Sequence, residues 1–251
     1  MPRTRVDLHV KVLDDAVVDR AKARGIDVLV YAPHFQRVPD IRETAATYSS
    51  ADLLVVPGRE VFTGPWNDRR HLLGVGVTDP VPDFIDLPSA FEALTAQDAA
   101  VLVPHPTFLT VSLDRDRIAA NVDRIHAVET YNPKHLAHHN DRAADLVADL
   151  DVPAFGSSYA HLPGTVGEVW TTFDRDIDSE TALVEALQAG ADRTVAHRRG
   201  AGHRLRCLAE FGHLAWENSW QKIDRVLLSG MEPTHPRHVA YDGAFEDAAV
   251  Y

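Results

Sequence analysis

Cysteine, methionine and lysine are scarce in this chain of 251 residues. Cys207 is the only cysteine, which excludes an internal disulfide. The apolar runs fall far short of the roughly 20 residues that a membrane-spanning helix needs, and no signal peptide follows Met1. We therefore expect a cytoplasmic protein that does not use a membrane as a partner.

Lysine occurs only at positions 11, 22, 134 and 222, so arginine carries most of the positive charge. Asp and Glu number 37 against 25 Lys and Arg, which gives a formal net charge of −12. We interpret this acidic, lysine-poor composition as halophilic, since net charge governs solubility. An ordinary acidic protein from a GC-rich genome is the alternative. The same charge disfavours nucleic acid as a partner, because phosphate binding requires basic patches.

Strand and helix signals alternate along the chain. Predicted strands cover residues 5–12, 27–31, 53–57, 71–77, 100–104, 125–130, 153–156 and 193–197, and predicted helices cover 14–24, 40–48, 89–97, 114–122, 140–150, 179–188 and 203–228. Gly25 is the expected C-cap of the first helix, and Ser89 the expected N-cap of the third. Roughly seven strand–helix units with short connections indicate a parallel sheet wrapped by helices.

The chain is long enough, at 45% hydrophobic residues, to bury one large core. We expect an α/β barrel over residues 1–200. Residues 201–251 are expected to add a C-terminal helix and a tail that pack on the barrel within the same domain. The strand at 71–77 is expected to return beside the preceding strand.

Polar side chains follow the predicted strands. The carboxyl ends of barrel strands converge on one face, where active sites form. The residues there are His9, His34, Glu60, His105, Glu129, Asn132, His161 and Arg198. A single histidine at such a place is usually structural, but several histidines converging with a glutamate form a ligand set for zinc, manganese or iron.

Several short motifs occur in order between about residue 7 and about residue 167. They are Asp7-Leu8-His9-Val10, Ala32-Pro33-His34, Gly58-Arg59-Glu60, His71-Leu72-Leu73-Gly74, His105-Pro106, Glu129-Thr130-Tyr131-Asn132 and Ser157-Ser158-Tyr159-Ala160-His161. In order and spacing they resemble the motifs of the PHP (polymerase and histidinol phosphatase) family of metal-dependent phosphoesterases. Residues 203–236 resemble, more loosely, the C-terminal extension of some members.

The resemblance implies a distorted (β/α)7 barrel of PHP type and hydrolysis of a phosphate ester through a metal-activated water. The ester would be a small molecule or a nucleotide. The metal ligands implied are His9, His34, Glu60, His71, His105 and His161. Asn132, Glu129 and Arg198 would contact substrate, although Arg198 could instead pair with surface carboxylates.

Two ligand positions of the PHP pattern are replaced. The second histidine of the first motif is Lys11, and the aspartate of the last motif is Tyr159. We therefore expect one or two ions rather than three. Lys11 either supplies the charge of a lost metal, which we favour, or marks a decayed site in which it pairs with Glu60 or Asp7 or points to solvent. In the first case Lys11, Tyr159 and His34 would take part in catalysis.

Two other functions are compatible with these replacements. A non-catalytic barrel could bind an anionic ligand or a partner, with Lys11 in place of a metal. A metal-dependent hydrolase could also act on a substrate other than a phosphate ester. The sequence does not specify the oligomeric state.

Screening of the acidic surface provides a first prediction. At an ionic strength near 1 M the Debye length is about 3 Å, so repulsion between surface carboxylates is largely removed. We predict that Tm rises steeply between low salt and molar KCl, as measured by thermal melts followed by circular dichroism. A Tm that is flat or falls over this range would favour the GC-rich genome as the origin of the composition.

Overall fold

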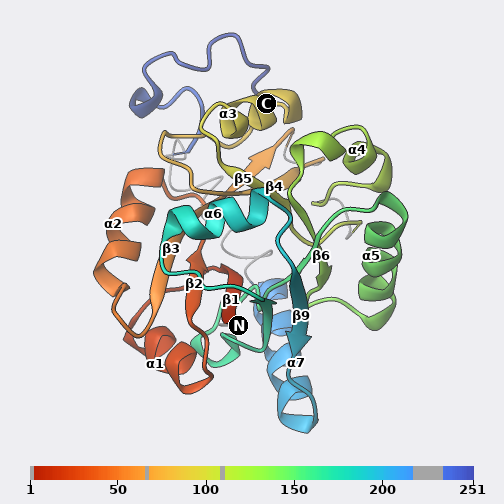
Figure 1. Ribbon diagram of the computed structural model, residues 1–251. Coiled ribbons are helices and arrows are strands. Elements are labelled where there is room, and N and C mark those ends of the chain that lie inside the picture. The colour runs from red at the N-terminus through yellow and green to blue at the C-terminus, as the bar shows by residue number, and fades with distance from the viewer. Residues whose placement is uncertain (1–2, 66–67, 108–110, 217–233) are drawn as a thin grey trace.

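The computed structural model describes residues 3–65, 68–107, 111–216 and 234–251 (Figure 1). Its nine-stranded sheet curves into a nearly closed barrel with the strand order β7-β6-β5-β4-β3-β2-β1-β8-β9. The strands are β1 (Thr4–Val10), β2 (Val28–Tyr31), β3 (Leu54–Thr63), β4 (Arg70–Val75), β5 (Ala100–Val103), β6 (Ala127–Tyr131), β7 (Ala154–Gly156), β8 (Val169–Phe173) and β9 (Arg193–His197). The predicted distorted barrel is confirmed.

Helices cover the outside of this barrel (Figure 1). Those in the described residues are α1 (Asp15–Ala23), α2 (Val38–Tyr48), α3 (Leu87–Thr95), α4 (Arg115–Ala119), α5 (Ala137–Leu150), α6 (Glu180–Gln188) and α7 (Ala201–Trp216). The C-cap of α1 is Arg24 rather than the expected Gly25, which follows it with a φ of +68°, the left-handed conformation common just after a helix. The expected cap at Ser89 is wrong, because the side chain of Asp86 accepts from the Ser89 amide and α3 begins at Leu87.

The start of α5 also differs from the prediction. α5 begins at Ala137 rather than near Asn140, so His138 and His139 belong to its first turn. The predicted continuation of α7 to Leu228 lies outside the described residues.

The sheet mixes parallel and antiparallel pairs. β1, β2 and β3 are parallel, as are β5, β6 and β7, while β4 runs antiparallel between β3 and β5. The predicted return of β4 beside β3 is confirmed. The prediction missed β8, which pairs antiparallel with both β1 and β9. Its buried Val169, Thr171 and Phe173 alternate with less buried residues, which is the period of a strand.

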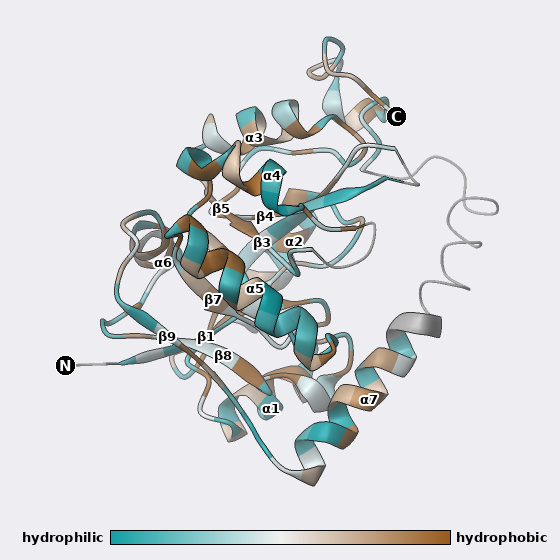
Figure 2. Ribbon diagram, turned by 90° about the vertical axis from the view of Figure 1, so that its right-hand side faces the viewer, coloured by the Kyte–Doolittle hydropathy of each residue, from teal (hydrophilic) through white to brown (hydrophobic). Residues whose placement is uncertain are grey.

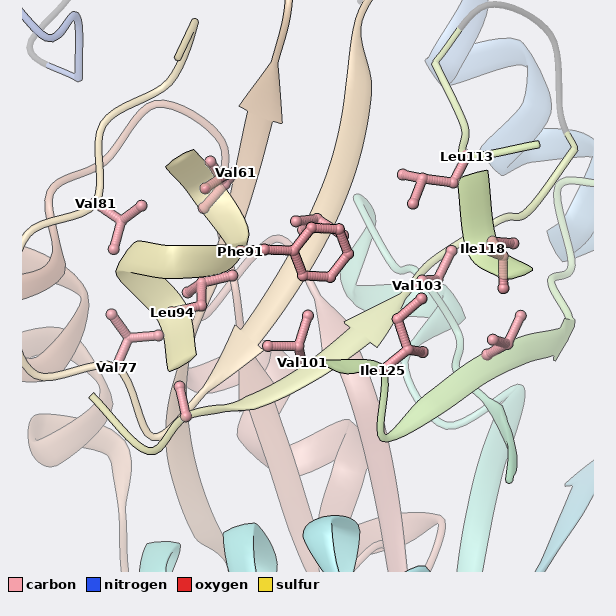
Figure 3. Packing of buried hydrophobic residues seen from close by; sticks show 14 of the residues in the cluster. Val61, Val77, Val81, Phe91, Leu94, Val101, Val103, Leu113, Ile118 and Ile125 are labelled. Carbon is pink, nitrogen blue, oxygen red and sulfur yellow. The ribbon is translucent and has the colours of Figure 1, made fainter. Parts of the chain in front are cut away.

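Alternation along the strands separates two cores. On β5, Val101 and Val103 point outward and pack with Phe91 and Leu94 of α3 (Figure 3). Ala100 and Leu102 belong instead to the cluster inside the barrel, which also contains Leu183, Ala186 and Leu187 of α6. α6 lies across the end of the barrel where the parallel strands begin (Figure 1). Polar side chains can therefore collect only at the opposite end.

The described part of the tail lies over α3, whereas α7 projects from the other end of the molecule (Figure 2). Val250 forms a bridge with Ile85, and the Asp86 amide donates to Ala249. The described end of the tail is thus fastened to the residues just before α3. None of the described helices has the length and apolar character that a membrane crossing requires.

The seam of the barrel lies between β7 and the antiparallel pair of β8 and β9. The Gly156 amide donates to Thr171 Oγ1, which donates in turn to the Gly156 carbonyl, at 3.0 Å in both cases. A Cβ on Gly156 would lie 2.5 Å from Val195 Cγ1 and 3.1 Å from Val169 Cγ1. Only glycine at position 156 therefore lets the strands approach this closely.

We predict that Gly156→Ala destabilises the protein. The added methyl group would force apart the two sides of the seam, and overpacking of this kind costs about 1–3 kcal/mol. Urea denaturation measures the free energy of unfolding. Gly164→Ala is the matched control, because no atom lies within 4 Å of the place that its Cβ would take, and the substitution should leave stability unchanged or slightly higher. Equal stability of the two variants would contradict the account of the seam.

Candidate metal centre

Glu60 is the centre of the polar end of the barrel. It lies within β3 and is fully buried, while its neighbour Arg59 points to the other face of the strand and pairs with Asp83. Lys11 and four histidines surround the Glu60 carboxylate at the following distances. Oε1 is 3.3 Å from His71 Nδ1, 3.4 Å from His105 Nε2 and 3.6 Å from His9 Nε2, and Oε2 is 2.5 Å from Lys11 Nζ and 2.9 Å from His34 Nδ1. Oε1 thus faces three imidazoles, and Oε2 faces an ammonium group and one imidazole.

The Oε1 side has the composition of a metal site. Ligand atoms of Glu60, His71 and His105 lie within 4.8 Å of one another, the one such group in the described residues. His9 adjoins them, and both of its buried ring nitrogens lack a hydrogen-bond partner. The Nε2 of His71 is also buried without one. Unpartnered polar atoms are costly in a protein interior, so these donors fit a divalent cation.

Burial keeps the imidazoles of His9, His34 and His71 neutral. It lowers the pKa of His9 well below its usual value, and the charge of Lys11 adds to the effect. Burial and then Lys11 lower the pKa of His34 to about 3. Burial lowers the pKa of His71 to about 4, although Glu60 opposes the shift. Neutral imidazole is the form that binds metals.

The Oε2 side is occupied by Lys11. Its ammonium donates to Glu60 Oε2 and, at 2.6 Å, to the Ala32 carbonyl. It also lies 5.5 Å from the centre of the Tyr159 ring. The pairing with Glu60 is compatible with both expected roles of Lys11, the replacement of a lost metal and the decayed site. Burial alone would raise the pKa of Glu60, but Lys11 leads the opposing effects and holds it well below its usual value. An outward-pointing Lys11 is excluded, because the residue is only 6% exposed.

Asp7, the other carboxylate considered for Lys11, has a different role. It is fully buried, and its oxygens accept from the amides of Ser158 and Gly167 at 2.9 Å. Burial raises the pKa of Asp7 to about 6 against the effect of these hydrogen bonds. Asp7 thereby fastens the loop after β7 to the first strand.

A second buried lysine was missed by the sequence analysis. Lys134 Nζ lies 2.5 Å from His161 Nδ1, 3.3 Å from Glu210 Oε2 and 4.1 Å from the centre of the Tyr159 ring. Lys134 follows the motif that ends at Asn132. The scarcity of lysine could have drawn attention to Lys134, since Lys11 and Lys134 are two of only four lysines in the chain.

Arg69 is a further buried cation that the sequence analysis missed. Its guanidinium lies 6.0 Å from the centre of the Phe62 ring. Burial lowers the pKa of Arg69, and the nearby Tyr159 opposes this shift. Lys11 and Lys134 therefore lie close to Tyr159, and Arg69 interacts with it electrostatically.

His161 belongs to the Lys134 side of the centre rather than to the Glu60 group. Its Nε2 lies 3.4 Å from His34 Nε2. Glu210 of α7 accepts from the amides of His161 and Leu162 and from the Thr165 hydroxyl. α7 thus fixes the loop that carries His161. The metal-ligand role of His161 remains a prediction.

Glu129 and Asn132 organise the loops around the centre. Glu129 accepts from the His105 amide, from Ser157 Oγ and from Asn132 Nδ2. Asn132 Oδ1 accepts from the Lys134 amide. These hydrogen bonds fix the backbone at His105 and Lys134. Glu129 and Asn132 thus lie at the predicted end of the barrel, but their side chains already have protein partners there.

Arg198, the third residue predicted to contact substrate, points elsewhere. Its guanidinium donates to the carbonyls of Gly167 and Arg24 and lies 5.7 Å from the centre of the Trp170 ring. The alternative of a pairing with a surface carboxylate is not observed in these contacts either.

Comparisons with known proteins agree with this architecture. A family described as PHP-associated matches residues 137–191. A search of curated proteins finds no match. The structure is similar to PsfC from Pseudomonas syringae, with a TM-score of 0.64 and 18% identity over 87% of this chain and 100% of PsfC.

Two further solved structures are similar. One is a two-domain protein from Bacteroides vulgatus that contains a predicted PHP-like metal-dependent phosphoesterase, with a TM-score of 0.59 and 18% identity over 83% of this chain and 70% of the other. This chain has a PHP phosphoesterase-like fold. The other is an amidohydrolase from Chromobacterium violaceum with bound sulfate and no metal, with a TM-score of 0.54 and 15% identity over 76% of this chain and 97% of the other.

We predict that Lys11→Met strongly destabilises the metal-free protein. The substitution keeps the length of the side chain but leaves the buried Glu60 carboxylate without its closest positive charge. Breaking a buried ion pair costs about 3–5 kcal/mol, whereas replacing both partners is far less harmful. Urea denaturation should therefore show a large loss for Lys11→Met and a partial recovery when Glu60→Gln is added.

Lys22→Met is the control for this experiment, because Lys22 is a partly exposed lysine 3.9 Å from Asp52. Its loss should change stability by less than about 1 kcal/mol. If Lys11→Met were as mild as Lys22→Met, the pairing of Lys11 with Glu60 would not be the source of charge compensation in this centre.

Proposed function

We propose that this protein is a metal-dependent hydrolase of phosphate esters that uses one divalent ion together with Lys11. The observation that supports the proposal is the division of Glu60 into two sides. Oε1 faces His9, His71 and His105, and Oε2 faces the Lys11 ammonium. A carboxylate that bridges two metals would need both oxygens for cations. Here Lys11 supplies the cation at one of the two oxygens.

Glu60, His71 and His105 would hold the ion, with His9 beside them. Zinc, manganese and iron all accept this set of imidazole and carboxylate ligands. A divalent ion would act there as a Lewis acid towards the phosphoryl group and make water a better nucleophile.

The cations near Tyr159 are suited to an anionic substrate. Lys134 lies 4.1 Å and Lys11 5.5 Å from the centre of the Tyr159 ring, and Arg69 is close to the same residue. A concentration of positive charge in a protein of net charge −12 would attract a phosphate dianion and stabilise charge that develops during its reaction. Lys11, Lys134 and Arg69 would orient the phosphoryl oxygens.

His34 and His161 would handle protons. Their Nε2 atoms are 3.4 Å apart, and His34 Nδ1 lies 2.9 Å from Glu60 Oε2. His34 is the more accessible of the imidazoles around Glu60, with its side chain 13% exposed. With His34 Nδ1 turned to Glu60 and His161 Nδ1 turned to Lys134, the pair could hold a proton at His161 Nε2 and deliver it to the oxygen of the leaving group.

A metal-free barrel that binds an anion is the second candidate. The contact between Lys11 and Glu60 favours it, because it compensates the buried carboxylate without any ion. The amidohydrolase from C. violaceum, which has a similar fold, contains sulfate and no metal. The two candidates differ in metal content and in turnover.

We predict that the protein binds about one equivalent of zinc or manganese and hydrolyses phosphomonoesters. His105→Ala should reduce metal content to near zero, because it removes one of the three clustered ligands, and should lower kcat/KM by at least about 100-fold, the size of effect expected when a metal-dependent nucleophile is lost. Elemental analysis after dialysis and a panel of phosphomonoesters measure the two effects.

The control is His138→Ala, which removes an exposed histidine in the first turn of α5. It should keep both metal and activity. Wild-type protein without stoichiometric metal or turnover, but with measurable phosphate binding, would replace the hydrolase with the anion-binding barrel. Two equivalents of metal would show that Lys11 does not stand in for an ion.

A further inference from the structure

Among the described residues, three phenylalanine rings border the metal centre on the side of His34 and His71. Phe62 stacks on the His71 ring with centroids 4.0 Å apart and planes 4° apart, and lies 5.2 Å from the His34 ring. Phe35 meets Phe62 edge-on at 4.8 Å. Phe84 is nearly parallel to Phe35, with an angle of 20° and centroids 6.4 Å apart. The rings form a continuous aromatic wall that starts at a candidate metal ligand.

The wall is buried at its base and accessible at its outer part. Phe62 is only 6% exposed, whereas Phe35 and Phe84 are half-buried. Phe35 follows β2 directly after His34, and Phe84 immediately precedes the α3 region. Apolar rings that remain accessible beside a polar centre are suited to contact with a bound molecule.

The backbone at both accessible rings is strained. Phe35 has a φ of 53° and Phe84 a φ of 65°, a left-handed conformation that is unfavourable for bulky residues. The aspartates with positive φ in this chain, such as Asp151 at the end of α5, are of a type that tolerates it. Strain of this kind persists only where the surroundings impose it and is concentrated at functional sites.

Contacts from two other segments impose the conformation of Phe84. Its amide donates to the Phe62 carbonyl, and its carbonyl accepts from the amide of Tyr251. The His235 ring of the tail lies 6.1 Å from the Phe84 ring. The C-terminal tail therefore helps to hold Phe84 in place next to Phe35.

From these observations we infer that Phe35 and Phe84 bind a planar aromatic leaving group of the substrate, an aryl group or a nucleobase. The inference rests on the proposed hydrolysis of phosphate esters. The cations near Tyr159 would hold the phosphate, and the aromatic wall on the His34 side would stack with the group attached to it. His34 lies between these two regions, 6.1 Å from the Phe35 ring and 5.5 Å from the His161 ring, where the ester oxygen would need a proton.

Phosphonates with matched substituents test this inference without turnover, because their carbon–phosphorus bond is not hydrolysed. Phenylphosphonate and cyclohexylphosphonate have rings of similar size, but only phenyl is planar. Isothermal titration of the metal-loaded full chain should show that phenylphosphonate binds at least about five-fold more tightly. 5′-Deoxyadenosine 5′-phosphonate, titrated in parallel, distinguishes a nucleobase from an aryl group by which ligand binds more tightly.

Phe35→Leu and Phe84→Leu should each reduce the preference for phenyl over cyclohexyl to nearly one. Leucine keeps apolar volume but has no planar face, and two variants protect the test if one fails to fold. Phe211→Leu is the control, because it removes an exposed aromatic ring from α7. It should keep the wild-type preference.

Equal affinities of the wild type for the two ring phosphonates, with no tighter binding of the adenosine phosphonate, would overturn the inference. An undiminished preference in both Phe35→Leu and Phe84→Leu would do the same. A different result would overturn the proposed hydrolysis alone: selective binding of phosphonates by a protein that turns over no phosphomonoester.

Discussion

The buried charge of Glu60 is the constraint on which the polar end of the barrel depends. A carboxylate in the interior is tolerated only when cations or hydrogen bonds compensate it. Here compensation comes from Lys11 and His34 on one oxygen and from three imidazoles on the other. Because these partners come from four segments, namely β1 with the residue after it, β4 and the loops after β2 and β5, the barrel must be assembled before Glu60 is satisfied. Folding and the making of the site are therefore one event.

The sequence predicts the members of this ring well and their surroundings poorly. His9, His34, Glu60 and His105 were identified because they end or follow strands whose apolar patterns are clear, and barrel geometry brings such positions together. His71, which begins a predicted strand, was identified only through the resemblance to the PHP family. Lys134, Arg69 and the phenylalanines were missed because they lie in loops or at strand ends where no periodicity specifies direction. Lys134 reaches the centre through the hydrogen bonds of Asn132 and Glu129, which depend on tertiary contacts.

Two C-terminal segments contribute to the centre from opposite sides. α7 supplies Glu210, which holds the loop of His161, and the tail supplies Tyr251, which holds Phe84. Within their described residues, neither segment joins the group of Glu60, His71 and His105. Their effect is to fix the cation side and the aromatic side of the centre.

The arrangement of the cations around Tyr159 depends on Gly156. The glycine that lets the barrel close is followed at once by Ser157, Ser158 and Tyr159, and Asp7 pins the same loop to the first strand. The position of Tyr159, and with it the spacing of the cations, is thus set by how tightly two strand edges meet a few residues earlier. A small opening of the barrel would weaken binding of the proposed anionic ligand before any helix unfolds. The affinity for the proposed anionic ligand would then be a more sensitive measure of barrel closure than the content of secondary structure.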